Sequence, residues 1–255
     1  MPYDAQMDLN NEWIKTAIVF YDSKVCYNPP QKLLLFKKAY RTLKKRINIK
    51  SGTIILDLGC GCGQITGALS PSEVTIIGID ISKNSIKQAK SFYPQSNFLC
   101  ADMNNVPFKK NTFDIITAIS SLEFCFDKAR ILRVAKEKLR DNGRLYIEVR
   151  NNDFIVYRLM EPLFSFCKKS FFIKDYPAKD FQDLGYDEWI DLFIDSGFNV
   201  EKTFVSAWPW NFGPFGIRIK NFIIMITKYL APLKYHYTIG VVLKKNNKRV
   251  NQGLP

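Results

Sequence analysis

Between residues 53 and 149 the chain alternates short, continuous apolar runs with longer amphipathic segments. The apolar runs have the length of strands and lack the polar alternation of a half-exposed sheet: TIILDL (53–58), VTIIGI (74–79), NFLC (97–100), FDIITAI (113–119) and GRLYIEV (143–149). Strands that are apolar on both sides belong to a parallel sheet covered by helices on both faces. The alternation therefore predicts an α/β fold.

The segments between these runs carry helix signals. Residues 63–70 can open a helix directly after the first strand, and Ser82 can cap a helix that runs to about Tyr93. Residues 127–139 have helical spacing, with four apolar side chains on one face: Ile131, Leu132, Ala135 and Leu139. The first, second and fourth predicted strands are thus each followed by a segment that can cover the sheet.

The two ends of the chain extend this core. Residues 10–21 and 29–47 read as two helices, and YDEWIDLFIDSG (186–197) reads as an amphipathic helix that Gly197 ends. FNVEKTFV (198–205) and YTIGVVLKK (237–245) read as two final strands. We therefore expect a single large domain rather than two.

We expect three regions along the chain. Residues 1–49 form an N-terminal helical cap, and residues 50–246 form the α/β domain. Two aromatic-rich insertions interrupt the domain at about 150–185 and 207–234, and residues 247–255 form a basic tail.

The basic charge is concentrated in two segments. The net charge is +13, yet residues 32–50 hold eight Lys or Arg and residues 202–255 hold nine, with no acid in either segment. Such segments favour anionic partners, namely phosphorylated substrates, nucleic acid or anionic lipid headgroups, although for each segment taken alone a solvated helix face or a basic tail is the favoured explanation. Charge alone therefore selects no partner.

The N-terminus and the cysteines indicate the compartment. Residues 1–20 lack a basic region followed by an apolar run, so we expect no signal peptide. The most apolar long window, Ile217 to Leu233, contains three basic residues and is too short to span a bilayer. The six cysteines form no C-x-x-C pair, and without a secretory signal we expect no disulfide framework and a cytoplasmic location.

The first predicted strand ends in ILDLGCGCG, residues 55–63, which is a glycine-rich strand-to-helix turn. Such a turn lets a ligand approach the backbone closely and points helix N-terminal amides at it. The dinucleotide fingerprint G-x-G-x-x-G fails in both registers, because Gln64 and Thr66 stand where the third glycine is required. The pattern present is instead an acid followed by three alternating glycines.

Three acids lie at or just after the ends of the first three strands. Asp57 precedes the glycines and would repel a pyrophosphate, whereas it suits a ligand with an ammonium group. Asp80 ends the second strand, where a carboxylate can accept hydrogen bonds from a ribose diol, and Asp102 follows the third strand. Together they describe a cofactor with an amino-acid part, a ribose and a base but no phosphate, and S-adenosylmethionine fits that description.

These motifs carry a resemblance to a known family. ILDLGCGCG, IIGIDIS, FLCADMNNVPFKKNTFDIITAISSLEFCFD, LRVAKEKLRDNGRLYIEV and GYDEWIDLFIDSGFNVEKTF occur in order at suitable spacing. In this respect the chain resembles the class I S-adenosylmethionine-dependent methyltransferases, particularly the small-molecule type that includes quinone-biosynthesis enzymes. The resemblance covers about residues 50–150 and 186–245. It implies a Rossmann-like seven-stranded sheet of order 3-2-1-4-5-7-6, with strand seven antiparallel.

The resemblance also implies a cofactor site. In it Asp57 lies near the methionine part and the glycine loop runs past that part, Asp80 binds the ribose hydroxyls, and Asp102 with the Met103 amide reads the adenine. Ile81 packs on the adenine face, and Ala118 and Ile119 lie beside the cofactor. The full expected set is Asp57, Gly59, Cys60, Gly61, Gly63, Asp80, Ile81, Asp102, Met103, Ala118 and Ile119.

Two departures from the family pattern matter. The family often has Leu-Glu-His after strand four, and Phe124 replaces that histidine. RDNG (140–143) replaces the family's Lys-Pro-Gly-Gly with other good turn residues, so we expect a turn there. The loss of the histidine removes one candidate acid, base or substrate contact.

No catalytic residue stands out. Methyl transfer from a sulfonium is an in-line displacement, and it needs a base only when the acceptor is a neutral hydroxyl or thiol. His236, Glu123 and Tyr21 are the candidates, and Tyr157 and Tyr186 are further possible pocket residues. A zinc site at Cys60 and Cys62 would have to recruit distant residues, because the chain has one histidine and no second cysteine pair, so we expect no metal.

The acceptor is expected to meet the N-terminal helices and the two insertions, which lie over the carboxyl ends of the strands in this architecture. Both insertions are aromatic and apolar, which favours a hydrophobic or carrier-linked small molecule. The second insertion suits either docking on an anionic membrane surface or packing on the sheet edge. The alternatives are methylation of RNA or protein, although no RNA-binding module is evident, and a cofactor-binding protein without turnover.

Overall fold

The computed structural model describes residues 41–69, 73–154, 184–205 and 232–246, together with Lys15, Thr16, Ile18, Val19 and Asp22. Seven strands form one sheet in the order β3-β2-β1-β4-β5-β7-β6. The strands are β1 (Ile54–Leu58), β2 (Thr75–Asp80), β3 (Asn97–Cys100), β4 (Phe113–Ile119), β5 (Leu139–Arg150), β6 (Phe198–Val205) and β7 (Thr238–Lys245). The predicted strand order is confirmed.

Strand direction also follows the prediction. The first five strands pair in parallel, whereas β7 pairs antiparallel with both β5 and β6. The carboxyl ends of β1 to β5 therefore meet at one edge of the sheet, and β6 runs in the same direction as β5.

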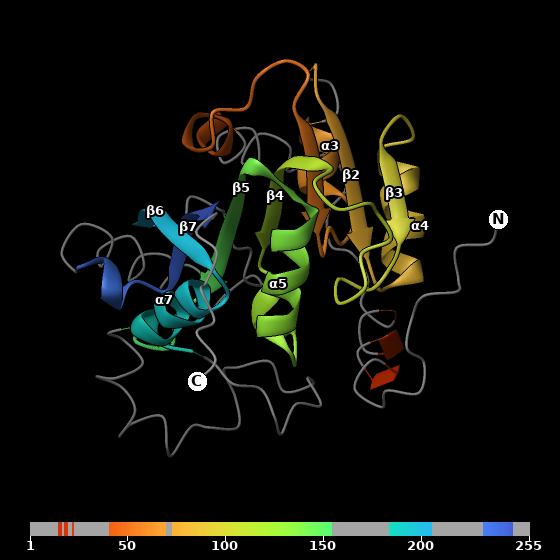
Figure 1. The fold of residues 1–255 in the computed structure, drawn as a ribbon. Helices are drawn as coiled ribbons and strands as arrows, with labels where there is room; N and C mark the ends of the chain where they lie inside the picture. The colour runs from red at the N-terminus through yellow and green to blue at the C-terminus, as the bar shows by residue number, and fades with distance from the viewer. Residues whose placement is uncertain are drawn as a thin grey trace, which may run out of the picture.

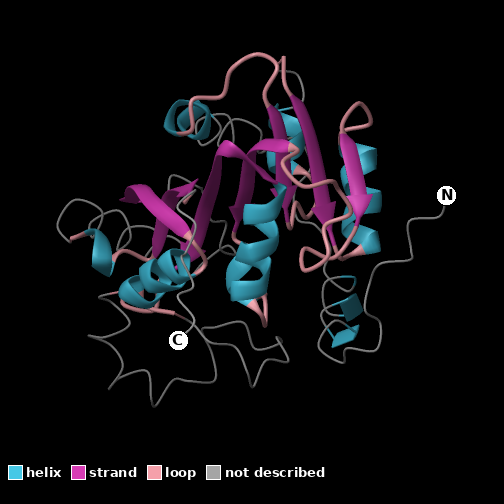
Figure 2. Cartoon of the chain, in the orientation of Figure 1, coloured by secondary structure: helices cyan, strands magenta, loops and turns pink. Residues whose placement is uncertain are grey.

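Helices cover both faces of the sheet (Figure 1; Figure 2 shows the same view by secondary structure). The helices are α3 (Gln64–Leu69), α4 (Lys83–Phe92), α5 (Lys128–Lys138) and α7 (Tyr186–Asp195), and two short 3-10 turns are η3 (Leu122–Phe124) and η4 (Leu233–Tyr235). In Figure 1, α5 and α7 lie in front of the sheet, and α3 and α4 lie behind it. Ser82 caps α4 as predicted, because its hydroxyl oxygen accepts a hydrogen bond from the Ser85 amide.

Two apolar clusters explain this layering. Alternate side chains of the central strands pack in front against Leu132 of α5 and Trp189 of α7. The intervening side chains pack behind against Leu69 of α3 and against Leu43 and Ile47, which lie in the predicted helix at 29–47. Because the central strands β1, β2, β4 and β5 contribute to both clusters, their continuous apolar runs are accounted for.

The expected turn at residues 140–143 is wrong in form. These residues belong to β5, and its pairing with β4 shifts register there, from Phe113 opposite Leu139 to Ile115 opposite Arg144. The good turn residues of RDNG thus make an irregularity inside a long strand rather than a loop that precedes it.

Parts of the domain prediction lie outside the described residues. These are most of both insertions, the basic tail and most of the N-terminal cap, so the predicted boundaries and the interfacial docking of the second insertion stay predictions. None of the described helices has the length and apolarity needed to cross a bilayer.

Candidate functional site

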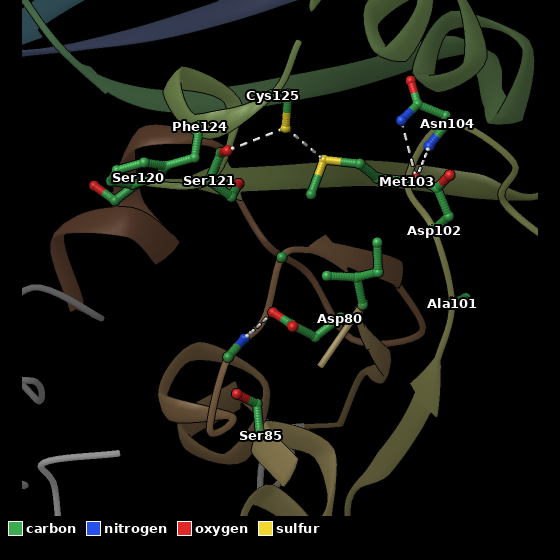
Figure 3. Close-up of a pocket in the computed structure, with 13 residues that line it drawn as sticks. Asp80, Ser85, Ala101, Asp102, Met103, Asn104, Ser120, Ser121, Phe124 and Cys125 are labelled. Carbon is green, nitrogen blue, oxygen red and sulfur yellow. Dashed lines mark hydrogen bonds between the residues drawn. The ribbon is translucent and has the colours of Figure 1, made fainter. Parts of the chain in front are cut away.

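A cavity of about 180 Å³ lies at the carboxyl ends of β1 to β4 (Figure 3). The loop after β1, the ends of β2 and β3, the turn after β4 and the first turn of α4 each contribute to its wall. The lining residues are Gly59, Gly61, Asp80, Ile81, Ser85, Ala101, Asp102, Met103, Asn104, Ser120, Ser121, Phe124 and Cys125. Four strand ends that are separate in the sequence thus converge on one cavity.

The glycine loop needs glycine for two reasons. Gly59, Gly61 and Gly63 all have positive φ angles, of 68°, 51° and 80°. A Cβ on Gly59 would lie 2.4 Å from the Ser121 Cβ, whereas a Cβ on Gly61 would have no protein atom within 4 Å. The loop therefore packs against the end of β4 at Gly59 and leaves open space at Gly61, which lines the cavity.

Asp80 is held by backbone amides on both sides. Its Oδ2 accepts a hydrogen bond of 2.8 Å from the Gly61 amide, and its Oδ1 accepts one of 2.9 Å from the Ser82 amide. Burial raises the pKa of this carboxyl, although the two amides oppose the shift. The carboxylate thus ties the glycine loop to the end of β2 and keeps a fixed orientation in the cavity wall.

Asp102 is fixed by the residue two positions further along. Its Oδ1 accepts hydrogen bonds from the backbone amide of Asn104 at 2.8 Å and from the Asn104 Nδ2 at 3.0 Å. Beside it, the Met103 sulfur lies 3.3 Å from the Cys125 sulfur, which joins the end of β3 to the turn after β4 (Figure 3). This end of the cavity combines one carboxylate with an apolar, sulfur-rich wall.

Asp57 does not line the cavity. Its side chain is buried beneath the loop, and its two oxygens accept hydrogen bonds from the hydroxyls of Thr66 (2.9 Å) and Thr117 (2.8 Å). Burial raises the pKa of Asp57 to about 6, and both hydroxyls act against that rise. The carboxylate therefore joins β1, α3 and β4 under the glycine loop.

Six of the expected cofactor residues line the cavity, and five do not. Gly59, Gly61, Asp80, Ile81, Asp102 and Met103 are in the wall, whereas Asp57, Cys60, Gly63, Ala118 and Ile119 are not. Gly63 packs behind the loop, since a Cβ there would lie 2.5 Å from the Phe98 ring. Ala118 is buried and belongs to the front apolar cluster.

The cysteines of the loop differ from one another. Cys60 is a free thiol whose pKa burial raises well above its usual value, so it stays protonated. Cys62 is disulfide-bonded, and the expectation of no disulfide is therefore wrong for this residue. Across the described ranges, no three His, Cys, Asp or Glu side chains are grouped so that they could hold a metal ion.

The catalytic candidates are not gathered at the cavity. His236 and Glu123 are both buried, and neither is among the lining residues; Tyr21 lies outside the described residues. Phe124 does line the cavity at the position where the family often has histidine, and the Arg150 guanidinium lies 5.0 Å from the centre of its ring. The cavity wall is thus aromatic at the position of the lost histidine.

The prediction missed seven lining residues. Five of them directly follow a strand end or lie within one turn of it: Ala101, Asn104, Ser120, Ser121 and Phe124. Extending each strand end by a few residues would have found them. The positive φ of Ser120, at 50°, has no signal in the sequence, because serine rarely adopts it.

The charge of the described lining is one-sided. It contains two carboxylates, Asp80 and Asp102, and no Lys, Arg or His. Such a wall is unfavourable for a pyrophosphate and suits an uncharged or cationic ligand that offers hydroxyl or amine donors.

Comparison with known proteins agrees with this geometry. Residues 56–147 match a family described as a methyltransferase domain. The uncharacterized protein MJ0638 of Methanocaldococcus jannaschii is 30% identical over 174 residues, which cover 68% of this chain and 73% of that protein. The ubiquinone biosynthesis O-methyltransferase of Coxiella burnetii is 28% identical over 139 residues, which cover 51% of this chain and 59% of that enzyme.

Solved structures share the fold. The crystal structure of a SAM-dependent methyltransferase from Aquifex aeolicus superposes with a TM-score of 0.54 at 16% identity, covering 91% of this chain and 96% of that one. The matching domain, the relatives, the strand order and the cavity at the glycine loop lead to one family. This chain belongs to the class I S-adenosylmethionine-dependent methyltransferases.

Proposed function

We propose that this protein transfers a methyl group from S-adenosylmethionine to a small-molecule acceptor that is hydrophobic or carrier-linked. The observation that carries the proposal is the cavity in which Gly59, Asp80 and Asp102 meet, with two carboxylates and no basic residue in its described wall. The ubiquinone-biosynthesis relative supports a small hydrophobic acceptor.

The strand order fits the shape of the cofactor. The ends of β3, β2, β1 and β4 follow one another along the carboxyl edge. Adenine would lie against Asp102 and Met103 at β3, the ribose diol would donate to Asp80 at β2, and the amino-acid part would lie between the glycine loop and the turn after β4. S-adenosylmethionine supplies a methyl group already activated by its sulfonium. The protein has to orient that group and exclude water.

The described wall offers no general base. Asp80 and Asp102 accept hydrogen bonds from backbone amides, and burial raises the pKa of the Cys125 thiol, which keeps it protonated. We therefore propose an acceptor atom that is already nucleophilic at neutral pH, such as an amine, a phenolate or a stabilised carbanion. The pH dependence of the transfer rate would then follow the ionisation of the acceptor.

A labelled-methyl assay tests this function. The protein is incubated with methyl-labelled S-adenosylmethionine and fractions of a cell extract, and the labelled product is identified by mass. We expect the label in a small, organic-soluble product. Label found in RNA or protein alone, or tight binding of total tRNA on filters at physiological salt, would overturn the small-molecule acceptor. Negligible turnover with every fraction would indicate a cofactor-binding protein.

A second assay addresses the membrane. The sequence of the second insertion suggests interfacial docking, which we propose only as a location for an apolar acceptor. Flotation with vesicles that contain anionic lipids is the direct measurement, and protein that remains at the bottom of the gradient rules this location out.

A further inference from the structure

Asp22 contacts the domain at the start of α4, about sixty positions along the chain. Its Oδ1 accepts a hydrogen bond of 2.6 Å from the Ser82 hydroxyl and one of 3.1 Å from the Asn84 amide. The Asn84 side chain returns a third, donating from Nδ2 to the Asp22 carbonyl at 2.9 Å. Figure 1 shows the described N-terminal residues below the carboxyl ends of β2 and β3, on the side of α4.

Ser82 connects this contact to the cavity. It is fully buried, and its hydroxyl donates to Asp22 while its oxygen accepts from the Ser85 amide at 3.0 Å. Its own amide donates to the Asp80 Oδ1 at 2.9 Å. One residue therefore holds the cavity carboxylate with its backbone and Asp22 with its side chain.

The bond from Asp22 fixes the direction of the Ser82 hydroxyl. A hydroxyl has one proton, and when that proton points at Asp22 the lone pairs remain for the Ser85 amide in the first turn of α4. Without Asp22, the buried Ser82 hydroxyl would lose its hydrogen-bond acceptor. The Ser82 side chain would then rotate toward another acceptor. The backbone of residue 82 would then hold Asp80 less firmly.

Hydrogen bonds and the charge of Asp22 shift the pKa of Asp80 in opposite directions. The pKa of Asp80 is raised first by burial and further by the nearby negative charge of Asp22, against the backbone hydrogen bonds from Ser82 and Gly61. An amide at position 22 would keep an oxygen acceptor for Ser82 and remove the charge. The two effects can therefore be separated by substitution.

We propose that Asp22 is a positioning residue that acts through Ser82 to orient Asp80 toward the ribose diol of an adenosine-containing ligand. This inference rests on the proposed function, because it assumes that Asp80 binds that diol. Asp22 is not among the residues that line the cavity, so its effect on ligand affinity is indirect.

The test compares the affinity of S-adenosylhomocysteine and its 2′-deoxy and 3′-deoxy analogues by calorimetry. Asp22→Ala should lower the affinity for S-adenosylhomocysteine by about tenfold. The affinity for the deoxy analogues should fall by much less, because these analogues lack a hydroxyl that Asp80 would bind. Asp22→Asn should stay within about twofold of the wild type, since it keeps the acceptor. Asn84→Ala, which leaves the Ser82 contact intact, is the matched control and should also stay near the wild type.

Each remaining result bears on the inference. Unchanged affinity in Asp22→Ala overturns it, and so does an equal loss for all three ligands, which is what a purely structural contact would produce. If Asp22→Ala fails to fold, Asp22→Glu keeps the charge but displaces the acceptor by one methylene, and it must show the same ribose-specific loss. Wild-type protein that binds none of the ligands refutes the proposed function itself and this inference with it.

Discussion

For Asp57, the charge could be interpreted from the sequence, whereas the position of its side chain in the fold could not be predicted. Its acidity before the glycines predicted a ligand without phosphate, yet the structure puts the carboxylate under the loop between Thr66 and Thr117. Neither threonine has a motif of its own, because a hydroxyl beneath a loop is defined only when β4 and α3 are brought together. The hydrogen-bond partners of Asp57 could therefore not be predicted from the sequence, and its effect on the ligand stays a prediction.

The ionisation of Asp57 should destabilise the ligand-free protein above pH 6. Its folded pKa, about 6, is above the ordinary value of 3.8, so between these values the folded state binds more protons than the unfolded state. The free energy of unfolding therefore falls as pH rises from about 4 to 6, by an amount on the order of 3 kcal/mol for this group.

Asp57→Asn should remove this fall. The amide can accept from Thr66 and donate to the Thr117 oxygen, whose hydroxyl can turn to the Leu56 carbonyl. We expect the variant to be the more stable protein at pH 7.5 and to match the wild type at pH 4. Urea unfolding at both pH values measures the two free energies of unfolding. A wild type that is more stable than the variant by the same amount at both pH values would contradict the prediction.

Gly59 is a second residue whose role depends on its neighbour. Gly59→Ala should cost about 2 kcal/mol, since it combines a left-handed backbone with a Cβ placed against Ser121, and it should weaken S-adenosylhomocysteine binding by displacing the loop. Gly52→Ala shares the positive φ but meets no atom within 4 Å, so it should lose only about 1 kcal/mol and keep its ligand affinity. Equal behaviour of the two variants in calorimetry would argue against a packing role for Gly59.

At the scale of elements, one arginine joins the helical residues 41–46 to β5 and to the edge strand β6. The Arg46 guanidinium lies 3.6 Å from the centre of the Phe204 ring, donates to the Val205 carbonyl at 3.0 Å and donates to the Tyr146 hydroxyl at 3.3 Å. Tyr146 in turn donates to the buried carboxylate of Glu148, which lies 3.8 Å from the guanidinium. The end of the N-terminal helix is thereby tied to β5 and β6.

Arg46→Ala should therefore destabilise the fold by about 2 kcal/mol, because Tyr146 and Glu148 would lose a cationic neighbour in a buried setting. Arg46→Met keeps the packing on Phe204 and should lose less. The exposed neighbour Lys44 is the control, and its alanine variant should stay within about 0.5 kcal/mol of the wild type in urea unfolding. An equally large loss of unfolding free energy in Lys44→Ala would show that the positive charge of this helix, rather than the Arg46 contacts, stabilises the fold.

The elements themselves were largely predictable, and the reason is local. The runs at 97–100 and 113–119 are strands at those positions, because continuous apolar residues bounded by turn signals leave little choice of boundary. The exception is RDNG at 140–143, where local turn propensity competes with pairing to the neighbouring strand. The pairing of β5 with β4 passes from Leu139 to Arg144, so these four residues form an irregularity within the strand that turn propensity alone did not predict.

At the scale of the molecule, ligand binding should raise thermal stability. At a concentration one hundred times its dissociation constant, S-adenosylhomocysteine should raise the melting temperature of the wild type by about 5–10 °C. Asp80→Ala should show no such shift, because its carboxylate holds both the glycine loop and the start of α4. Asp187→Ala, at an exposed carboxylate of α7, should shift like the wild type. Binding that survives Asp80→Ala would refute the assignment of this residue.

All described residues of the cavity wall come from one uninterrupted stretch of chain, from Gly59 to Cys125. Both aromatic insertions predicted from the sequence follow that stretch. Recombination could therefore exchange the later segments between relatives without changing any described residue of the cavity wall. Such an exchange suits this architecture to a change of acceptor specificity. Chimaeras joined after residue 125 should inherit ligand affinity from one parent and, from the other, the part of the acceptor preference that the two insertions determine.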